Sequence, residues 1–526
     1  MSAKRKRNRW AWRVGLGRLV FVLCLLLASG AHAADSTDST ETTGVGGNAV
    51  NVWPFYDERN DPVDRMHVQS GLGPLLMFDR SPNDAVENMA VRPLFRWRED
   101  KAARSLEWEF LYPLMTYTRS EEDAKFQFLQ ILNFRKSATD PEAREDRFDV
   151  FPIYMSGTTE TGKKYLAILP FGGWAPNRWF QDEAEFVLFP LYARFVKQGA
   201  ETRYFPWPII SVTRGEKRSG FRILPLYGEE TKEGVFEKRF VLWPLFLQQR
   251  TGLDGGSPEE TLSILPFYVS QRSKDRDRTT VLWPFFTYTD DREHQFEQWD
   301  VPWPLIQIAR GEGRTVNRFL PLFSVEHRVV REQLFLREMV RDNLVLLFPL
   351  YVRTQEKFVG SLKVRDRVLW WLYSDERETG KDGSTRRVDA WPFFRYTRDR
   401  EGAIQFQTLA LLEAFMPGNE KIERNYSPLW ALYTYRRNPE GDSVWAFLWN
   451  LLRHEETSTG RSIEVLGPLL AYQERGEDAH FSLLGGLFEC EVRHGTRSVS
   501  LFRNVTFAWT GTPQTLAVLA PAGGTR

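Results

Sequence analysis

Cys490 and His494 form the most metal-like pair of the sequence, because a Cys-x3-His spacing matches half of a zinc site. On an extended strand, however, residues four apart are separated by about 13 Å, which is too far to share one ion. The remaining histidines are scattered along the chain. We therefore expect no metal site here and interpret Cys490 as a lone, half-buried thiol.

Other signals of catalysis are weak. His454-Glu455-Glu456 lacks a second histidine at helical spacing, and the Gly44–Gly47 cluster has no phosphate-binding Lys-Ser/Thr pair after it. Paired acids such as Asp290 and Asp291 could bind calcium or hydrolyse glycosides, but they are interleaved with arginine in segments that need solubilising charge. No Gly-x-Ser-x-Gly motif is present. We expect a protein that is not an enzyme and has no cofactor and no metal.

The dominant feature of the sequence is a repeat of about 20 residues. Its core is an aromatic residue or Leu, then Pro, then Leu, Phe or Ile, and then an aromatic or aliphatic residue. Eighteen of the 29 prolines occupy this position. When four proline-free repeats are filled in, the 414 residues from Pro54 to Pro468 make 21 steps. Such a period indicates a repeat architecture.

The residues that we expect to matter most are the prolines and tryptophans of these cores, and we expect their role to be structural. They are Trp53, Pro54, Pro113, Pro152, Pro190, Pro225, Trp243, Pro244, Pro266, Trp283, Pro284, Pro349, Trp391 and Pro392.

One repeat reads as extended structure. The run from Phe240 to Leu247 has eight apolar residues, is rich in β-formers and carries Pro244 near its centre. It fits one strand per repeat, or two short strands meeting at the proline, followed by a charged turn. We predict an all-β fold of about 22–24 short antiparallel strands that closes as a large barrel or barrel-like roll. A helix is conceivable only over residues 331–344.

Proline cannot donate to a sheet ladder, so its recurrence at one level predicts a line of bends or bulges across the sheet. Both faces of each strand centre are apolar, as in the sequence around Trp243. We therefore expect the centres to be buried on both faces. Trp243→Ala should then cost about 3–5 kcal/mol of stability.

Length, charge and the amino-terminal segment set the broad class. The chain has 526 residues, of which 14% are aromatic. Residues 1–33 combine a basic start, a short apolar run and Ala31-His32-Ala33, as a secretory signal does. Removing their seven Lys/Arg leaves 63 basic against 69 acidic side chains, a net charge of −6. This balance, with its signs interleaved, argues against nucleic acid as a partner.

The expected organisation follows. Residues 1–33 are a signal peptide, 34–50 a disordered linker, 51–510 a single β-repeat domain and 511–526 a loose carboxy-terminal tail. After residue 33 no apolar stretch is long enough for a membrane-spanning helix. Cleavage of the signal would leave Cys490 as the only cysteine, so no intrachain disulfide is expected.

An export signal, more than twenty short strands and abundant tyrosine and tryptophan resemble bacterial outer-membrane β-barrels in general style, over nearly the whole chain after residue 33. The resemblance implies outer-membrane lipid as a partner. Two observations oppose it. The strand centres do not alternate apolar and polar residues, and the chain ends Ala520–Arg526 without a terminal aromatic strand residue.

The direction of the strands opposes it as well. Similar segments begin at Tyr112, Trp283 and Trp391, nine and five repeats apart. With one strand per repeat, an odd separation would point copied segments in opposite directions, although a membrane barrel has unlike ends. The alternative is a soluble, exported β-solenoid-like protein whose aromatics stack between neighbours.

On this evidence the expected function is that of a non-catalytic bacterial cell-envelope protein. The first candidate is an outer-membrane, barrel-like conduit or scaffold, suited by its apolar interior to apolar cargo. The alternative is a soluble binding or structural protein of the periplasm or cell surface.

Overall fold

A computed structural model describes residues 50–121, 123–137, 146–159, 161–332, 337–502, 505–510 and 517–519. The predicted signal peptide 1–33, nearly all of the predicted linker 34–50 and most of the predicted tail 511–526 lie outside the described residues. The chain divides into two compact units. Unit 1 comprises Met1–Tyr112 and Ala390–Arg526, and unit 2 comprises Pro113–Asp389, so unit 2 is inserted into unit 1 along the sequence.

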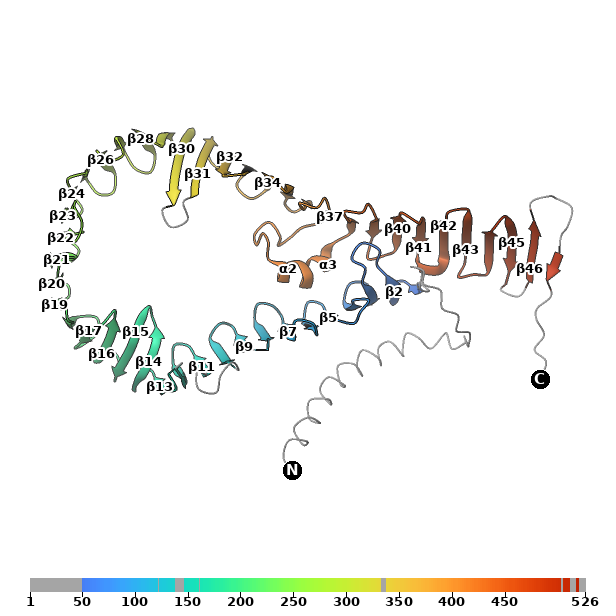
Figure 1. The fold of residues 1–526 in the computed structure, drawn as a ribbon, viewed down its shortest axis with the longest axis horizontal. Helices are drawn as coiled ribbons and strands as arrows, with labels where there is room; N and C mark the ends of the chain where they lie inside the picture. Colours follow the sequence, from blue (N-terminus) through green and yellow to red (C-terminus); the bar gives the residue numbers. More distant parts are fainter. Residues whose placement is uncertain are drawn as a thin grey trace, which may run out of the picture. The chain divides into compact units, whose positions relative to one another are not determined.

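Unit 2 is built from short strands that follow one another in chain order (Figure 1). Consecutive strands pair with each other in antiparallel orientation from β8–β9 through β33–β34. The strands are β8 (Met115–Arg119), β9 (Asp123–Phe128), β10 (Leu132–Ser137), β11 (Asp146–Val150), β12 (Tyr154–Thr158), β13 (Lys164–Ile168), β14 (Gly172–Arg178), β15 (Gln181–Val187), β16 (Tyr192–Lys197), β17 (Ala200–Tyr204), β18 (Ile210–Arg214), β19 (Arg218–Ile223), β20 (Tyr227–Lys232), β21 (Phe236–Val241), β22 (Phe246–Thr251), β23 (Glu259–Ile264), β24 (Tyr268–Arg272), β25 (Arg276–Val281), β26 (Phe286–Asp291), β27 (Phe296–Asp300), β28 (Ile306–Gly311), β29 (Arg314–Phe319), β30 (Phe323–Glu332), β31 (Arg337–Leu346), β32 (Tyr351–Phe358), β33 (Ser361–Val368), β34 (Tyr373–Gly380) and β35 (Gly383–Ala390).

Unit 1 contains the first and last strands of the chain and two short helices. They are β1 (Val50–Val52), β2 (Tyr56–Asn60), β3 (His67–Gly71), β4 (Leu76–Arg80), β5 (Val86–Val91), β6 (Phe95–Asp100), β7 (Ser105–Phe110), β36 (Phe394–Arg398), β37 (Ile404–Thr408), α2 (Glu420–Asn425), α3 (Ser427–Trp430), β38 (Tyr433–Arg437), β39 (Ser443–Phe447), β40 (Leu452–Thr457), β41 (Gly460–Val465), the 3-10 helix η1 (Gly467–Leu469), β42 (Leu470–Arg475), β43 (Asp478–Leu483), β44 (Phe488–Arg493), β45 (Thr496–Leu501), β46 (Val505–Thr510) and β47 (Ala517–Leu519).

The all-β, antiparallel prediction is confirmed, but the predicted 22–24 strands are too few. Each repeat forms two strands, and its proline lies in the turn between them rather than at the centre of one strand. In the turn between β21 and β22, the N–H of Leu245 donates to the carbonyl of Leu242 (2.8 Å), and the Trp243–Pro244 bond is cis. The physical reason is the missing N–H of proline, which cannot pair in a ladder but is tolerated in a turn.

The two kinds of turn lie at opposite edges of the sheet. Proline turns alternate along the chain with charged turns, so every proline turn of an up-and-down meander returns to the same edge. Neighbouring proline turns also bond to each other: the N–H of Trp243 donates to the carbonyl of Pro225 (2.6 Å), and that of Trp283 donates to Pro266 (2.7 Å). We call these edges the proline edge and the charged edge.

This arrangement corrects the argument from strand direction. Because each repeat contributes two strands, the segments that begin at Tyr112, Trp283 and Trp391 all run away from a proline turn, whatever number of repeats separates them. Their odd separation therefore does not oppose a sheet with two unlike edges.

The sheet is not closed into a barrel by hydrogen bonds. Among the described residues, β1 pairs with β2 and β47 pairs with β46, and no ladder joins β1 to β47. Residues 331–344, the one place where a helix was conceivable, belong to β30 and β31 where they are described.

Many of the side chains buried in unit 2 are small, and some larger ones gather in clusters. One cluster gathers Phe186, Met155 and three alanines, with Phe189 and Tyr204 packed against it. The strand ends beside the prolines are not buried on both faces, contrary to expectation. Val241 and Phe246, which flank the turn of Pro244, are 45% and 44% exposed.

Unit 1 has two layers that come from opposite ends of the chain. The indole Nε1 of Trp53 donates to the carbonyl of Leu448 (3.0 Å), and Asn51 donates to Glu464 (2.9 Å). Helix α2 is capped by Asn419, whose side chain accepts from the N–H of Lys421 (3.1 Å). Lys421 in turn pairs with the buried Glu109 on β7 (2.8 Å). Among the described residues, no helix is long and apolar enough to cross a membrane.

Candidate functional site

All fourteen residues singled out from the sequence lie in turns at a proline edge, and none of them is buried. Trp243 and Trp283 expose 55% and 51% of their surface. The prediction that Trp243 is packed in a core is therefore wrong. An apolar run with proline at its centre is a turn here, so its largest side chain lies at the rim of the sheet. The predicted structural role of these residues stays a prediction.

This placement changes the effect expected of mutation. Trp243→Ala should now lower the free energy of unfolding by less than about 1 kcal/mol, because little apolar surface is buried there. Phe186→Ala, at a side chain only 2% exposed, should cost about 3–5 kcal/mol. Urea unfolding of the two variants checks this, and equal shifts of their midpoints would contradict the assignment of Trp243 to the rim.

The proline edges carry many exposed apolar side chains. Many large apolar residues at these turns are at least 40% exposed, although monomeric proteins rarely expose large contiguous apolar patches. Examples are Phe55, Leu94, Ile153, Phe171, Leu191, Leu226, Trp243, Phe267, Trp283, Phe285, Trp303, Leu322, Leu350, Trp370, Phe393, Leu484 and Phe502.

In unit 2, a row of apolar side chains continues this edge onto one face of the sheet. Residues paired across neighbouring strands share a face, and the pairs closest to most proline turns form a row of apolar residues and tyrosines that is interrupted at Gly172. At β17 and β27 the closest ladder pairs are instead Tyr204–Ser211 and Asp300–Gln307. There the row continues through Phe205 and Val301, whose N–H groups donate to the carbonyls of Ile210 (2.8 Å) and Ile306 (2.9 Å). We call it the turn-side row. It contains Met115, Phe128, Leu132, Val150, Tyr154, Ile168, Gly172, Val187, Tyr192, Ile210, Ile223, Tyr227, Val241, Phe246, Ile264, Tyr268, Val281, Phe286, Ile306, Phe319, Phe323, Leu346, Tyr351, Val368 and Tyr373.

The same face becomes charged toward the other edge. Two residues farther along each strand lies a mixed row, in which the rings of Tyr288 and Trp299 contact each other at a tilt of 43°, with centroids 4.2 Å apart. Two residues farther again lies a charged row, where Arg250 pairs with Glu260 (2.6 Å). The face thus passes from apolar to charged over four residues, which is about 13 Å.

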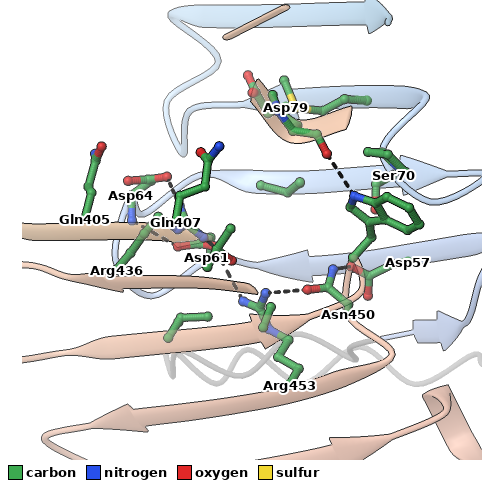
Figure 2. A pocket seen from close by; sticks show the side chains of 18 of the residues that line it. Asp57, Asp61, Asp64, Ser70, Asp79, Gln405, Gln407, Arg436, Asn450 and Arg453 are labelled. Carbon is green, nitrogen blue, oxygen red and sulfur yellow. Dashed lines mark hydrogen bonds and ion pairs between the residues drawn. The ribbon is translucent and has the colours of Figure 1, made fainter. Parts of the chain in front are cut away.

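Unit 1 holds a cavity of about 380 Å³ whose lining includes many charged side chains (Figure 2). Its lining includes residues of β2–β4 on one side and of β36–β40 on the other. Figure 2 shows Arg436 directed at Asp61 and Asp64, and Asn450 directed at Asp57. Arginine and carboxylate side chains from the two ends of the chain therefore meet in one cavity.

Arg59 is the best-connected cation of this cavity wall. Its side chain is 5% exposed and pairs with Asp57, with Glu464 (3.0 Å) and with Glu455 (3.6 Å). Arg453 lies 3.5 Å from Asp61 and pairs with Glu455 (2.7 Å). We call this set of ion pairs the clasp. These ion pairs join the two layers, because Arg59 from one end of the chain bonds Glu464 and Glu455 from the other, and Arg453 approaches Asp61.

The clasp shifts the titration of its acids. Burial raises the pKa of the Asp61 carboxyl, but Arg436, Arg453 and the backbone N–H of Asp64 outweigh it and hold that pKa well below its usual range. Glu464 behaves alike: burial raises its pKa, whereas Arg59 and the Asn51 hydrogen bond bring it below the ordinary value.

A pH dependence follows from these lowered pKa values. A carboxyl with a lowered folded pKa stabilises the fold above its unfolded pKa, and this stability is lost as the pH falls through the folded pKa. The free energy of unfolding should therefore be flat from pH 5 to pH 8 and decline below about pH 4. Asp61→Asn should remove about 2–3 kcal/mol of that decline. Urea titrations at several pH values test this, and an unchanged slope in the variant would contradict it.

Cys490 and His494 do not lie on one strand. Cys490 is free and half-buried on β44, whereas His494 lies in the following turn. Within the described part of the chain, no group of three or more His, Cys, Asp or Glu residues is placed to hold a metal ion.

Comparison with known proteins adds no assignment. No protein-family model matches the chain, and no curated protein matches it. The candidate site is therefore defined by the geometry alone: an exposed apolar edge and row in unit 2, and a clasp in unit 1.

The sequence identified the repeat prolines but missed both the face on which apolar residues gather and the clasp. The period of two could have revealed the face, since Val281, Phe286 and Tyr288 share it while Thr280 and Thr287 do not. Nothing in the spacing indicates the clasp, because Asp61 and Arg436 are 375 residues apart.

Proposed function

We propose that the protein is a non-catalytic, exported envelope protein that seats its proline edge in one leaflet of a lipid membrane. The observation that carries the proposal is the long apolar turn-side row, interrupted only at Gly172, which lies beside exposed apolar turns and opposite a charged edge. Burying apolar surface of this extent in water-free surroundings is strongly favourable, at roughly 25 cal/mol per Å². Acyl chains offer such surroundings along the whole length of the edge.

The length of the strands supports seating in one leaflet rather than crossing. Most strands of unit 2 have five or six residues, whereas a strand that spans a bilayer needs about 9–11. A turn and two rows extend roughly 15 Å, which is half of a hydrocarbon core of about 30 Å. We therefore propose a membrane-seated scaffold.

The export signal predicted for residues 1–33 directs this proposal to the bacterial envelope, with the outer membrane as the favoured surface. The alternative is a soluble periplasmic or surface protein whose apolar edge binds an apolar cargo. That alternative also uses the proline edge as the binding surface, but it predicts that washing removes the protein from the membrane. A role as a conduit stays a prediction.

Vesicle flotation tests the proposal. The chain from Ala34, mixed with vesicles of phosphatidylethanolamine and phosphatidylglycerol, should float with them and stay bound in high salt, because the contact is apolar rather than ionic. Recovery of the protein at the bottom of the gradient, at low and high salt, would refute the proposal.

Fractionation of the producing cells separates the two candidates. Retention in the membrane pellet after carbonate extraction favours the membrane-seated scaffold. Release of the mature protein into the soluble fraction favours the soluble cargo-binding protein.

A further inference from the structure

Resting on the proposed function, we infer that unit 2 meets the membrane with one face only: the face of the turn-side row contacts the acyl chains, while the opposite face at the same level stays out of them. Only one face of the sheet then contacts lipid, and this contact extends to the depth of one leaflet. The partner is the acyl-chain layer of a phospholipid leaflet.

The two faces differ at the same distance from the proline edge. Val281 is 48% exposed whereas its neighbour Thr280 is 2% exposed, and Phe286 is 41% exposed whereas Thr287 is 4% exposed. Since neighbours along a strand point to opposite faces, the strongly exposed apolar side chains of these two strand ends lie on one face only. On the other face, the hydroxyls of Thr280 and Thr287 bond to each other (3.0 Å).

The same row of the second face mixes polar residues with half-buried apolar ones such as Phe240, Leu247 and Val269. Asp300 is 2% exposed and accepts a hydrogen bond from the side-chain amide of Gln307 (2.7 Å). Ser211, Ser263 and Ser324 occupy the same row of the second face. Such groups gain nothing from hydrocarbon, where an unmatched polar group is costly.

The polarity along the first face matches the profile of a leaflet. Apolar turns and the turn-side row come first, the mixed row with Tyr288 and Trp299 follows, and the charged row of Arg250 and Glu260 comes last. A leaflet passes in the same order from acyl chains through an interface that favours tyrosine and tryptophan to charged headgroups. The match in charge and polarity fixes both the depth and the direction of insertion.

The extent of the row favours lipid over a second copy of the chain. From Met115 to Tyr373 it crosses consecutive strands that are spaced about 4.8 Å apart, which gives a length of more than 100 Å. A standard protein interface covers about 800 Å² on each partner. A fluid leaflet can follow a row of this length, whereas a rigid partner would leave most of it exposed.

Site-specific labelling tests the sidedness. Leu346 lies in the turn-side row and is 43% exposed, whereas Val345, beside it on β31, is half-buried on the opposite face. We would replace Cys490 with serine and introduce L346C, V345C or E260C for an environment-sensitive fluorophore. Glu260 lies in the charged row and is the control for depth.

With phosphatidylethanolamine–phosphatidylglycerol vesicles that carry doxyl-labelled acyl chains, the label at Leu346 should shift to the blue and be quenched several-fold. The labels at Val345 and Glu260 should do neither. A shift at both Leu346 and Val345, or at neither in a protein that floats, would overturn the inference. Failure of all variants to float would instead refute the proposed function, so the two failures are distinguishable.

Discussion

Replacing Arg59 with alanine is expected to lower the free energy of unfolding by about 3–5 kcal/mol, because it breaks buried ion pairs by removing one partner. Arg59 is 5% exposed and faces Asp57, Glu464 and Glu455. Its loss leaves buried carboxylates without their cation. Urea unfolding at neutral pH measures the effect, and an unchanged midpoint would contradict it.

The matched control is Arg250→Ala. Arg250 also pairs with a glutamate, at 2.6 Å from Glu260, but the two side chains are 52% and 61% exposed. Exposed pairs of this kind contribute about 0–1 kcal/mol. A large loss of stability in both variants would contradict the expectation that the ion pairs of Arg59 stabilise the fold because they are buried.

The second large effect concerns the proline edge. The double variant Phe171→Ser and Phe267→Ser should weaken vesicle binding at least a hundredfold, since each aromatic group withdrawn from lipid forfeits about 1.5–3 kcal/mol. The two side chains are 69% and 64% exposed, so the fold should be little affected. Flotation over a series of lipid concentrations measures the change in partitioning.

A control at the charged edge tests whether the position of the lost apolar side chains matters, and not only their hydrophobicity. Phe180 and Val359 are 93% and 87% exposed and lie in turns of the charged edge, between β14 and β15 and between β32 and β33. Phe180→Ser combined with Val359→Ser removes similar apolar surface from the edge that we expect to stay in water. Binding should be unchanged, and an equal loss in both double variants would contradict the assigned orientation.

The repeat sequence predicts the class of fold but not its strand boundaries. Period, β-formers and charged turns indicate an antiparallel sheet, which is confirmed. The turn at Trp243-Pro244 was hidden because its residues are apolar, with no Gly, Asn or Asp to mark it as most tight turns have. Only the missing N–H of proline distinguishes it from a strand centre, and that signal was interpreted as a bend within one strand.

The clasp was out of reach for a different reason. Its members Asp57, Arg59 and Asp61 on one side and Arg436 and Arg453 on the other come together only through packing of the two layers of unit 1. Charged residues on alternating strand positions usually face water, so their burial could not be recognised without the partner layer.

Because each repeat contributes two strands, the chain can be lengthened or shortened by whole repeats. Duplicating or deleting one repeat of about 20 residues changes the strand number by two, so all later turns keep their edges and all later side chains keep their faces. Related chains should consequently differ in length by whole repeats, and broader or narrower versions could arise in single genetic steps without inverting either surface.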